Sequence, residues 1–479
     1  MPDTHPVRIE TLIANAASRH PKRAALIFSA RRWTYGQLHA ETERRAALLV
    51  AAGLMPGDVV GIAEPMSDDV VIAFFACCRA GIVPLYLSPN LTAAELTPLV
   101  VRSAAKRMLR VVPAPHPALP DLPVLPLALP GVPTDHMPHH LAAHDADAVA
   151  CLRTTSGTTG GMAKLVVSSH RMITWRYATG AWAKSPGGVY YFPQTTFFPI
   201  VDFCTVFGIG DAIILSHAME PTRIEAEMAA HRATSLWSVP AVIRLLVAQS
   251  RPCPTGLMLR EVRTGAAPLA PDVEQAVMVR YGARLSQKYA STEGGSMIGT
   301  PRDGAPVGSI GAPFPGVETR LVDVKGRDVP EGGMGELIVR SPGIMCGYLD
   351  DAEATAQAVH DGWLWTGDLA RRDADGFYFL EGRRALRINV GGFKVTPEEV
   401  EAVLERHPAV REVVVMGIPD ATRGEIVRAV IVSRGERPTV RDLRRFCRER
   451  LAGYKVPRHW EFRDDLPRSP LGKVLRHKL

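Results

Sequence analysis

The chain has 479 residues, of which 46% are hydrophobic and 22% are charged, and its formal net charge is +7. The composition is that of a soluble globular protein, and the length favours more than one domain. The basic balance fits anionic small molecules such as nucleotides, whereas no stretch of interleaved basic and aromatic residues supports nucleic-acid binding.

The cysteines and the apolar runs argue against further classes of protein, namely disulfide-rich, zinc-binding, secreted and membrane-spanning proteins. The seven cysteines are scattered and form no C-x-x-C pair, which favours the reducing cytoplasm over a disulfide scaffold or a zinc site. No signal-peptide pattern opens the sequence, and no run approaches the roughly eighteen apolar residues of a membrane-spanning helix. We therefore expect a cytoplasmic protein without a membrane span.

The first part of the chain alternates between strand and helix patterns. Residues Trp33 to Tyr35 predict a short strand, and a helix is predicted over 36–52. A strand over 58–63, a helix over 69–80 and a strand over 83–87 follow. This alternation predicts a largely parallel, layered sheet. The proline-dense stretch 111–140 predicts an extended excursion over the surface.

A glycine-rich loop follows the strand predicted over 148–152. Its sequence is Thr154-Thr155-Ser156-Gly157-Thr158-Thr159-Gly160-Gly161-Met162-Ala163-Lys164. Glycine lets the backbone approach a ligand closely, N–H groups and hydroxyls donate to anionic oxygens, and the lysine adds a point charge. The spacing is not that of the Walker loop. Taken alone, the run is equally compatible with a phosphate-binding loop and with a flexible surface loop.

The pattern changes twice in the second half of the chain. From about 306 to 345 the sequence is rich in strand patterns separated by glycine turns, which predicts a small barrel or meander. The last hundred residues show a compact α+β pattern with an arginine-rich helix. We therefore expect a domain boundary near 383–387.

Seven motifs in order, from Trp33-Thr34-Tyr35-Gly36-Gln37-Leu38 to Gly472-Lys473, resemble those of the ANL superfamily of adenylate-forming enzymes. The resemblance spans the whole chain and implies an α/β fold. It implies a large N-terminal domain over 1–383, built from layered mixed sheets with helices and a small β-barrel-like subdomain. A hinge over 384–386 and a small mobile α+β domain over 387–479 complete the expected architecture.

The resemblance assigns roles in ATP binding to four segments. Tyr289 would face the adenine, Thr292 would bond the α-phosphate, and Glu293 would hold Mg²⁺. Asp368 and Arg383 would bind the ribose. The glycine-rich loop would hold the β- and γ-phosphates, although Ala163 and Leu165 depart from the usual proline and glycine. The further residues implied at the phosphates and the adenine are Thr155, Ser156, Gly157, Thr158, Thr159, Gly160, Lys164, Gly265, Ala266 and Ala267.

Two half-reactions would share this site through rotation of the C-terminal domain. The resemblance implies that Lys473 bridges the substrate carboxylate and the α-phosphate during adenylation. After rotation, Gly392 and Lys394 would line the tunnel for the thiol, where a missing side chain lets pantetheine pass. The hinge departs from the family pattern at Ala385 and Leu386, although a hinge needs only to absorb a backbone rotation.

The acyl pocket is expected to be lined by Thr196, Phe197, Phe198, Gly294 and Gly295. No aspartate has the flanking residues that amino-acid-activating domains use against an α-amine, because Asp202 lies nearby but out of pattern. This favours a plain organic acid, aromatic or aliphatic.

The sequence thus predicts an ATP- and Mg²⁺-dependent ligase that forms an acyl-AMP and transfers the acyl group to coenzyme A. One alternative is a stand-alone adenylation enzyme that loads a phosphopantetheinyl carrier protein, and a second is a degenerate nucleotide-binding protein. The arginine-rich helix is either a solvated face or a steering surface for CoA phosphates or an acidic carrier protein. Its arginines are Arg441, Arg444, Arg445, Arg448 and Arg450.

Overall fold

The computed structural model describes residues 7–112, 116, 119–127, 145–155, 163–178, 187–193, 199–265, 271–300, 305–323, 325–383, 388–467 and 479. The chain divides into two compact units. The larger unit comprises Met1–Pro89, Ser103–Thr154 and Leu165–Gly382, and the smaller unit comprises Asn90–Arg102, Thr155–Lys164 and Arg383–Leu479. Across the described ranges, no helix has the length and apolar character needed to cross a membrane.

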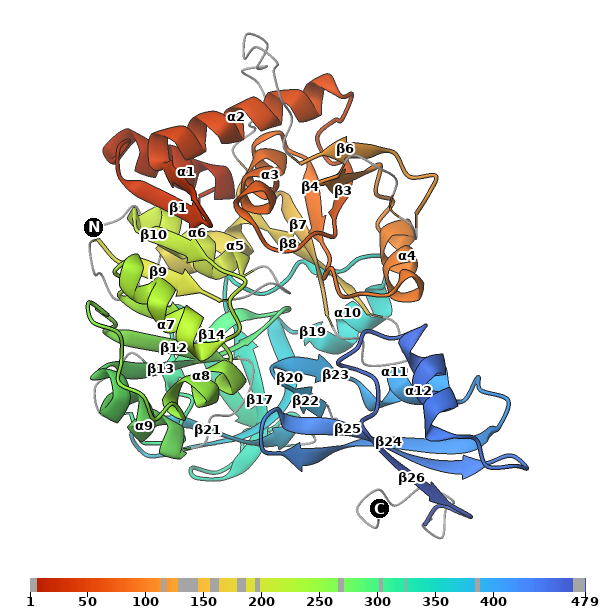
Figure 1. The fold of residues 1–479 in the computed structure, drawn as a ribbon. Helices are drawn as coiled ribbons and strands as arrows, with labels where there is room; N and C mark the ends of the chain where they lie inside the picture. The colour runs from red at the N-terminus through yellow and green to blue at the C-terminus, as the bar shows by residue number, and fades with distance from the viewer. Residues whose placement is uncertain are drawn as a thin grey trace. The chain divides into compact units, whose positions relative to one another are not determined.

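A nine-stranded sheet forms the centre of the larger unit (Figure 1). Its interior strands run parallel, and antiparallel strands pair at both edges. In spatial order the strands are β15 (Ala312–Pro313), β14 (Gly295–Gly299), β13 (Arg284–Ser291), β12 (Glu261–Gly265), β11 (Ser235–Trp237), β9 (Val189–Phe192), β10 (Ala212–Leu215), β1 (Ala24–Phe28) and β2 (Arg31–Thr34).

The larger unit also contains a seven-stranded sheet, most of whose strands come from residues 59–169. It is parallel except at β8 and β18, which pair antiparallel. In spatial order its strands are β18 (Gly347–Tyr348), β8 (Leu165–Ser169), β7 (Val149–Thr154), β4 (Val83–Tyr86), β3 (Val59–Ile62), β5 (Arg107–Arg110) and β6 (Val124–Pro126).

The β-rich stretch predicted after residue 306 forms a third, antiparallel sheet in the larger unit. Its strands are β16 (Glu318–Val322), β17 (Met334–Arg340), β20 (Trp363–Arg372) and β19 (Val359–His360), with β21 (Tyr378–Arg383) paired to β20. Short connections join β19 to β20 and β20 to β21, whereas β18 and α10 (Ala352–Ala358) lie between β17 and β19 in the chain.

Helices cover both faces of the nine-stranded sheet. Successive side chains along its strands point alternately into two apolar cores, one on each face. Leu26 and Ile213 belong to the core shared with the seven-stranded sheet, whereas their neighbours Ile27 and Ile214 belong to the core on the other face. The helices of the shared core are α1 (Ile9–Arg19), α2 (Tyr35–Ala51), α3 (Asp68–Arg79), α5 (His170–Ala178) and α6 (Ile200–Ile209); those of the other face are α7 (Pro221–Ala230), α8 (Pro240–Val247) and α9 (Pro271–Tyr281); and α10 (Ala352–Ala358) packs on β18.

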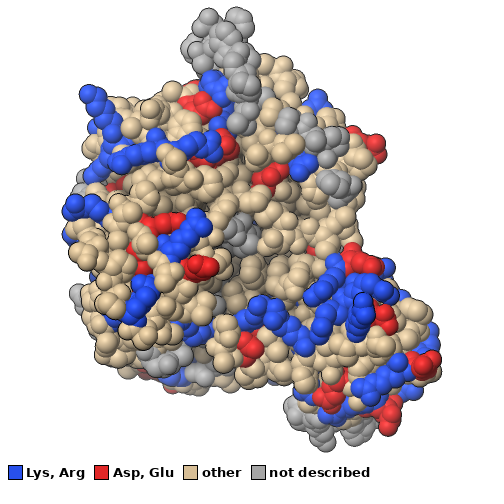
Figure 2. All heavy atoms as spheres, viewed as in Figure 1, with Lys and Arg blue, Asp and Glu red and all other residues tan. Residues whose placement is uncertain are grey.

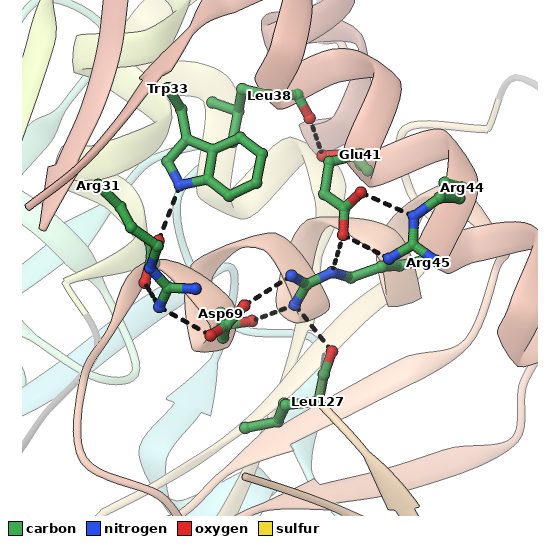
Figure 3. Close-up of polar contacts among 10 residues, drawn as sticks. Arg31, Trp33, Leu38, Glu41, Arg44, Arg45, Asp69 and Leu127 are labelled. Carbon is green, nitrogen blue, oxygen red and sulfur yellow. Dashed lines mark hydrogen bonds and ion pairs between the residues drawn. The ribbon is translucent and has the colours of Figure 1, made fainter. Parts of the chain in front are cut away.

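Ion pairs hold α2 against α3 (Figure 3). Arg45, which is 4% exposed, donates to Glu41 at 2.7 Å and to Asp69 at 2.6 Å. Its Nη1 also donates to the carbonyl oxygen of Leu127 at 2.8 Å, just beyond β6. Arg31 of β2 donates to the other oxygen of Asp69 at 2.8 Å. One buried guanidinium therefore joins two helices and a loop, which fixes the helical layer over the seven-stranded sheet.

The smaller unit contains a five-stranded sheet whose core is rich in valine and isoleucine. Its longest strands, β24 and β25, form an antiparallel hairpin, and β26 pairs parallel with β25. Its strands are β23 (Phe393–Val395), β22 (Ile388–Val390), β25 (Gly424–Ser433), β24 (Val410–Asp420) and β26 (His459–Arg463), and its helices are α4 (Ala93–Arg102), α11 (Pro397–Leu404) and α12 (Val440–Arg448).

The predicted α/β fold class is confirmed, and most predicted elements differ from the observed ones by one or two residues at their ends. One prediction is wrong: Tyr35 is the first residue of α2 and does not belong to the preceding strand. Thr34 accepts a hydrogen bond from the backbone of Gln37, whose side chain accepts one in return. This capping box begins the helix one residue earlier than the hydrophobic pattern indicates.

Candidate active site

Tyr289 and Asp368 come together from two sheets of the larger unit. Tyr289 lies on β13, and its hydroxyl donates to Oδ2 of Asp368 on β20 at 2.6 Å. The two residues are 8% and 6% exposed. The bond orients the carboxylate that the motifs assign to the ribose and holds it beside the ring that they assign to the adenine.

The residues before Asp368 explain the spacing of the Thr-Gly-Asp motif. Thr366 donates from its hydroxyl to the carbonyl of Leu337 at 2.6 Å, and this hydroxyl accepts from the backbone of Asp368 at 3.1 Å. Gly367 has a φ of +71°, which an L side chain rarely adopts, and its N–H donates to Glu336 at 3.1 Å. The threonine and the glycine therefore set the direction of the aspartate.

Arg153 connects the strand before the glycine-rich loop to the Thr-Glu segment. Its Nη2 donates to the carbonyl oxygen of Thr292 at 2.6 Å, and its Nε donates to Ser168 at 2.9 Å. Burial lowers the pKa of Arg153, while Cys151 and Glu293 act in the opposite direction. The sequence analysis missed this residue, although an arginine within the apolar run of β7 was an available signal.

Glu293 is oriented by a second residue that the motifs did not indicate. The hydroxyl of Tyr348, on β18, donates to Oε1 of Glu293 at 2.9 Å. The backbone N–H of Met345 donates to the carbonyl oxygen of Glu293 at 2.7 Å. Within the described ranges, no group of three or more His, Cys, Asp or Glu side chains is arranged to hold a metal ion. A single oriented carboxylate fits Mg²⁺, which is usually shared between one or two carboxylates and substrate phosphates.

The two glycines predicted to line the acyl pocket have packing roles. The N–H of Gly294 donates to Oγ of Ser291 at 2.9 Å, which closes a tight turn. A Cβ on Gly294 would stand 2.5 Å from Sδ of Met297, inside any allowed contact distance. Gly295 follows with a φ of +62°. A side chain at Gly294 would have to displace Met297 and Leu364, and one at Gly295 would adopt a strained backbone, whatever the substrate is.

In the smaller unit, the described ends of the glycine-rich loop are joined by a hydrogen bond. The N–H of Thr155 donates to the carbonyl oxygen of Lys164 at 2.9 Å. The chain that flanks the loop continues this pairing, because β7 and β8 run antiparallel with Thr154 opposite Leu165. The pairing of β7 and β8 thus extends to the described residues that flank the loop.

Gly392 lies in a turn that joins β22 to β23 in the smaller unit. Gly391 and Gly392 have φ values of +59° and +94°, and the flanking residues Val390 and Phe393 are paired. Two successive positive φ values are typical of the tightest hairpin turns. The N–H of Gly392 donates to Oδ1 of Asn389 at 3.1 Å. Asn389 thus supports this turn, and Lys394 follows it on β23.

Several predicted site residues lie outside the described residues, as do the side chain of Arg383 and the predicted hinge. Their roles therefore stay predictions. They are Ser156, Gly157, Thr158, Thr159, Gly160, Thr196, Phe197, Phe198, Ala266, Ala267 and Lys473. Gly265 is described as the last residue of β12, opposite Lys288 of β13.

Comparison with known families matches most of the chain. Residues 13–349 match the AMP-binding enzyme family, and residues 399–473 match the C-terminal domain of AMP-binding enzymes. The chain therefore belongs to the AMP-binding family of adenylate-forming enzymes, the ANL superfamily that its motifs indicated.

Individual relatives extend over nearly the whole chain. The chain is 30% identical over 518 residues to the fatty acid–[acyl-carrier-protein] ligase ScoC of Streptomyces coeruleorubidus, covering 99% of this chain and 97% of that protein. The structure of o-succinylbenzoate CoA synthetase from Bacillus subtilis is similar with a TM-score of 0.88 and 25% identity, covering 98% of each chain. That of the amide bond synthetase McbA from Marinactinospora thermotolerans has a TM-score of 0.88 and 27% identity, also covering 98% of each chain. The protein is thus an enzyme of the AMP-binding acid–CoA ligase family.

Proposed function

We propose that this enzyme is an ATP- and Mg²⁺-dependent acid–thiol ligase acting on an organic carboxylic acid, with coenzyme A as the acceptor. It would form an acyl-AMP with release of pyrophosphate and then pass the acyl group to the thiol. The hydrogen bond between Tyr289 and Asp368 carries this proposal, because it brings together the two groups that a nucleoside requires. One is an aromatic face and the other is a carboxylate that accepts from ribose hydroxyls.

The chemistry requires charge to be neutralised around the phosphates. A carboxylate is a poor electrophile, and adenylation replaces one of its oxygens with a good leaving group. Thr292 and Lys473 would donate to the α-phosphate, and positioned donors of this kind commonly contribute ~3 kcal/mol to lowering a barrier. Glu293, oriented by Tyr348, would hold Mg²⁺, which would add positive charge beside the phosphates.

Thioester formation would use the smaller of the predicted domains. We propose that a hinge over 384–386 lets residues 387–479 rotate between two positions, one presenting Lys473 and the other presenting Gly392 and Lys394. The tight turn at Gly391 and Gly392 supports this role, because it places backbone without side chains at a surface that would line a narrow tunnel.

A carrier protein is the second candidate acceptor. The relative ScoC is named for transfer to an acyl carrier protein. In the smaller unit, Lys and Arg side chains gather over α12 (Figure 2), where Arg441, Arg445 and Arg448 are exposed while Leu443 and Cys447 are buried. A basic helix attracts acidic carrier proteins and CoA phosphates alike, so the surface alone does not separate them.

Two assays test the proposal. Acid-dependent exchange of labelled pyrophosphate into ATP, across a panel of aliphatic and aromatic acids, measures adenylation alone. Thioester formation is then compared between free CoA and a holo-carrier protein, with a simple amine included as a third acceptor. Exchange with at least one acid and faster transfer to CoA are expected. Exchange followed by transfer only to the carrier would favour the second candidate, and no exchange with any acid would favour a degenerate nucleotide-binding protein.

A further inference from the structure

Helix α4 belongs to the smaller unit, although it precedes the predicted hinge in the chain. It connects β4 to β5 of the seven-stranded sheet, so it is joined on both sides to strands of the larger unit. Residues Asn90–Arg102, which contain α4, nevertheless form one compact unit with Arg383–Leu479. A rotation about residues 384–386, as proposed above, would move 387–479 relative to everything before the hinge. It would therefore separate α4 from the rest of the smaller unit.

A buried lysine joins α4 to the C-terminal part of the chain. Nζ of Lys455 donates to Oε1 of Glu95 on α4 at 2.9 Å and to Oε1 of Glu399 on α11 at 2.6 Å. The side chains of Lys455, Glu95 and Glu399 are 5%, 10% and 7% exposed. One ammonium thus bonds two carboxylates, of which one lies before the predicted hinge and the other beyond it. Without this ammonium, two like charges would be buried together, which is strongly unfavourable.

The start of α4 holds Glu95 in place for this contact. The backbone N–H and the hydroxyl of Thr92 donate to Oε2 of Glu95 at 2.9 Å and 3.0 Å. Thr92 directly precedes α4, and a glutamate three residues after a threonine is the spacing of a capping box. The helix therefore uses one carboxylate oxygen and Lys455 uses the other. Withdrawal of Lys455 would leave the bonds at the start of α4 intact.

The residue next to Lys455 connects this contact to the glycine turn of the smaller unit. The ring of Tyr454 stacks on that of Phe393, with ring centroids 4.3 Å apart and an interplanar angle of 21°. Phe393 directly follows Gly392 and is the first residue of β23. Lys455 and the turn proposed to line the thiol tunnel therefore lie on one face of the C-terminal residues. A contact between this face and α4 brings the turn toward elements that precede the hinge.

We propose that the bond between Lys455 and Glu95 stabilises the position of residues 387–479 that serves thioester formation, and that it breaks when Lys473 is presented for adenylation. The inference rests on the proposed function, to which it adds a residue that sets the balance between the two half-reactions. Glu95 is a positioning residue, because it acts through Lys455 and the stacked rings. On rotation Lys455 would keep Glu399, which lies on its own side of the hinge. The contact can therefore break without leaving the lysine unpaired, as a reversible switch requires.

Charge reversal at Glu95 tests the proposal by comparing the two half-reactions. Glu95→Lys places a second cation against Lys455. The rate of thioester formation from supplied acyl-AMP and CoA is expected to fall about tenfold or more relative to pyrophosphate exchange, because juxtaposed like charges oppose a contact. The control is Glu461→Lys. Glu461 bonds Arg428 and Arg463, and all three lie on strands beyond the hinge, so this reversal should lower stability and leave the ratio of the two rates unchanged. An unchanged ratio in Glu95→Lys, or an equal fall in both steps, would overturn the proposal.

A pair of variants tests whether Glu95 acts through Lys455. Lys455→Met leaves Glu95 and Glu399 facing each other without their shared ammonium, so thioester formation should fall relative to exchange. Glu95→Gln supplies an amide that can donate to Glu399. Added to Lys455→Met, it is expected to restore part of the ratio, whereas Glu95→Gln alone should not raise it. Residues in direct contact show such non-additive effects. Further loss in the double variant would overturn the contact between the two side chains.

A distance measurement tests the contact without any substrate. Spin labels are placed at Val101→Cys on α4, where the valine is 69% exposed, and at Arg441→Cys on the exposed side of α12. Cys253 and Cys346, the two cysteines that are not buried, are replaced by serine. Pulsed electron paramagnetic resonance on the full chain should show a population at the distance that the structure predicts. Glu95→Lys is expected to remove most of this population, and identical distance distributions would overturn the proposal.

Failure of the proposed function has a different signature. If no acid supports exchange, the ligase proposal fails, and the spin-label distances still show whether Glu95 holds residues 387–479 against α4. If exchange and thioester formation both occur while Glu95→Lys changes neither their ratio nor the distances, the ligase proposal stands and only this inference is wrong. If Glu95→Lys fails to fold, the same comparison between Lys455→Met and its double variant with Glu95→Gln decides.

Discussion

The guanidinium of Arg153 donates to the carbonyl oxygen of Thr292 at 2.6 Å and so connects the strand before the glycine-rich loop to the Thr-Glu segment. Arg153 lies on the seven-stranded sheet, whereas Thr292 follows β13 of the nine-stranded sheet. Without this contact, the predicted phosphate loop and the predicted α-phosphate donor would be held by two sheets with no direct bond between these segments. The contact uses a backbone acceptor, so it fixes the path of the segment and not only one side chain.

Arg153→Met is therefore expected to lower kcat/KM for pyrophosphate exchange by about 100-fold, because a displacement of about 1 Å at reacting groups has effects of this size. Saturation with ATP would not restore the rate. Arg171→Met is the control, since Arg171 makes an exposed pair with Asp147 nearby. Equal activity of the two variants would show that the contact to Thr292 is unimportant.

Tyr289→Phe keeps the ring and removes the bond to Asp368. We expect KM for ATP to rise about tenfold, because a buried carboxylate that loses a donor costs about 1–3 kcal/mol and is held less firmly. Steady-state kinetics with varied ATP measure this. Tyr191→Phe makes the same chemical change on β9 of the same sheet, at a bond to Glu227 of α7. It should lower thermal stability without raising KM, and a similar KM in both variants would contradict the role of Tyr289.

Lys473→Ala should lose adenylation yet still convert supplied acyl-AMP to the thioester, because the lysine is proposed to act in the first half-reaction only. Gly392→Val should show the reverse, with exchange retained and thioester formation reduced at least tenfold. Single-turnover assays of each step give the two rates. If both steps fall equally in Lys473→Ala, the two-position scheme is wrong.

Arg45→Met should destabilise the larger unit by about 2 kcal/mol, because it removes a buried guanidinium that bonds Asp69, Glu41 and the carbonyl of Leu127, although Arg31 and Arg44 still pair with the two carboxylates. Arg44→Met removes a 23% exposed arginine from the same Glu41 and should cost less than about 1 kcal/mol. Chemical unfolding followed by tryptophan fluorescence compares them. Equal losses would mean that the burial of Arg45 contributes nothing beyond the charge pair.

The stability of the larger unit should depend on pH through His170. Burial lowers the pKa of His170 to about 3, assisted by Arg8, and its Nδ1 accepts from the N–H of Ile9 at 3.2 Å. The unfolded chain takes up a proton below its ordinary value of 6.5, whereas the native protein does not. Stability is therefore lost as pH falls from about 6.5 toward 3, by up to about 1.4 kcal/mol per pH unit.

His170→Asn keeps an acceptor for Ile9 and removes this titration. Unfolding free energies of the wild type and the variant should diverge as pH falls from 7 to 4, with the wild type losing more. Burial raises the pKa of Glu10, which has the opposite effect on the slope, but Glu10 is present in both proteins and largely cancels in the difference. Parallel curves would show that His170 is protonated in the native protein.

The sequence predicted the fold well because alternating apolar runs determine where strands and helices form. It also indicated Tyr289, Asp368 and Glu293, because the short motifs that contain them resemble those of the family. It missed Arg153 and Tyr348, which reach the Thr-Glu segment from strands far away in the chain. Contacts of this kind depend on sheet order, and sheet order is not encoded in any single stretch.

The nine-stranded sheet also presents two different environments to consecutive residues. On β12, Val262 belongs to the apolar core, while the next residue, Arg263, is 7% exposed and donates to Glu261 on the same strand at 2.8 Å. A polar substitution at Val262 would place a polar group in an apolar core, whereas a change at Arg263 would break a buried ion pair. Substitutions at alternate positions of one strand thus destabilise the protein for different physical reasons.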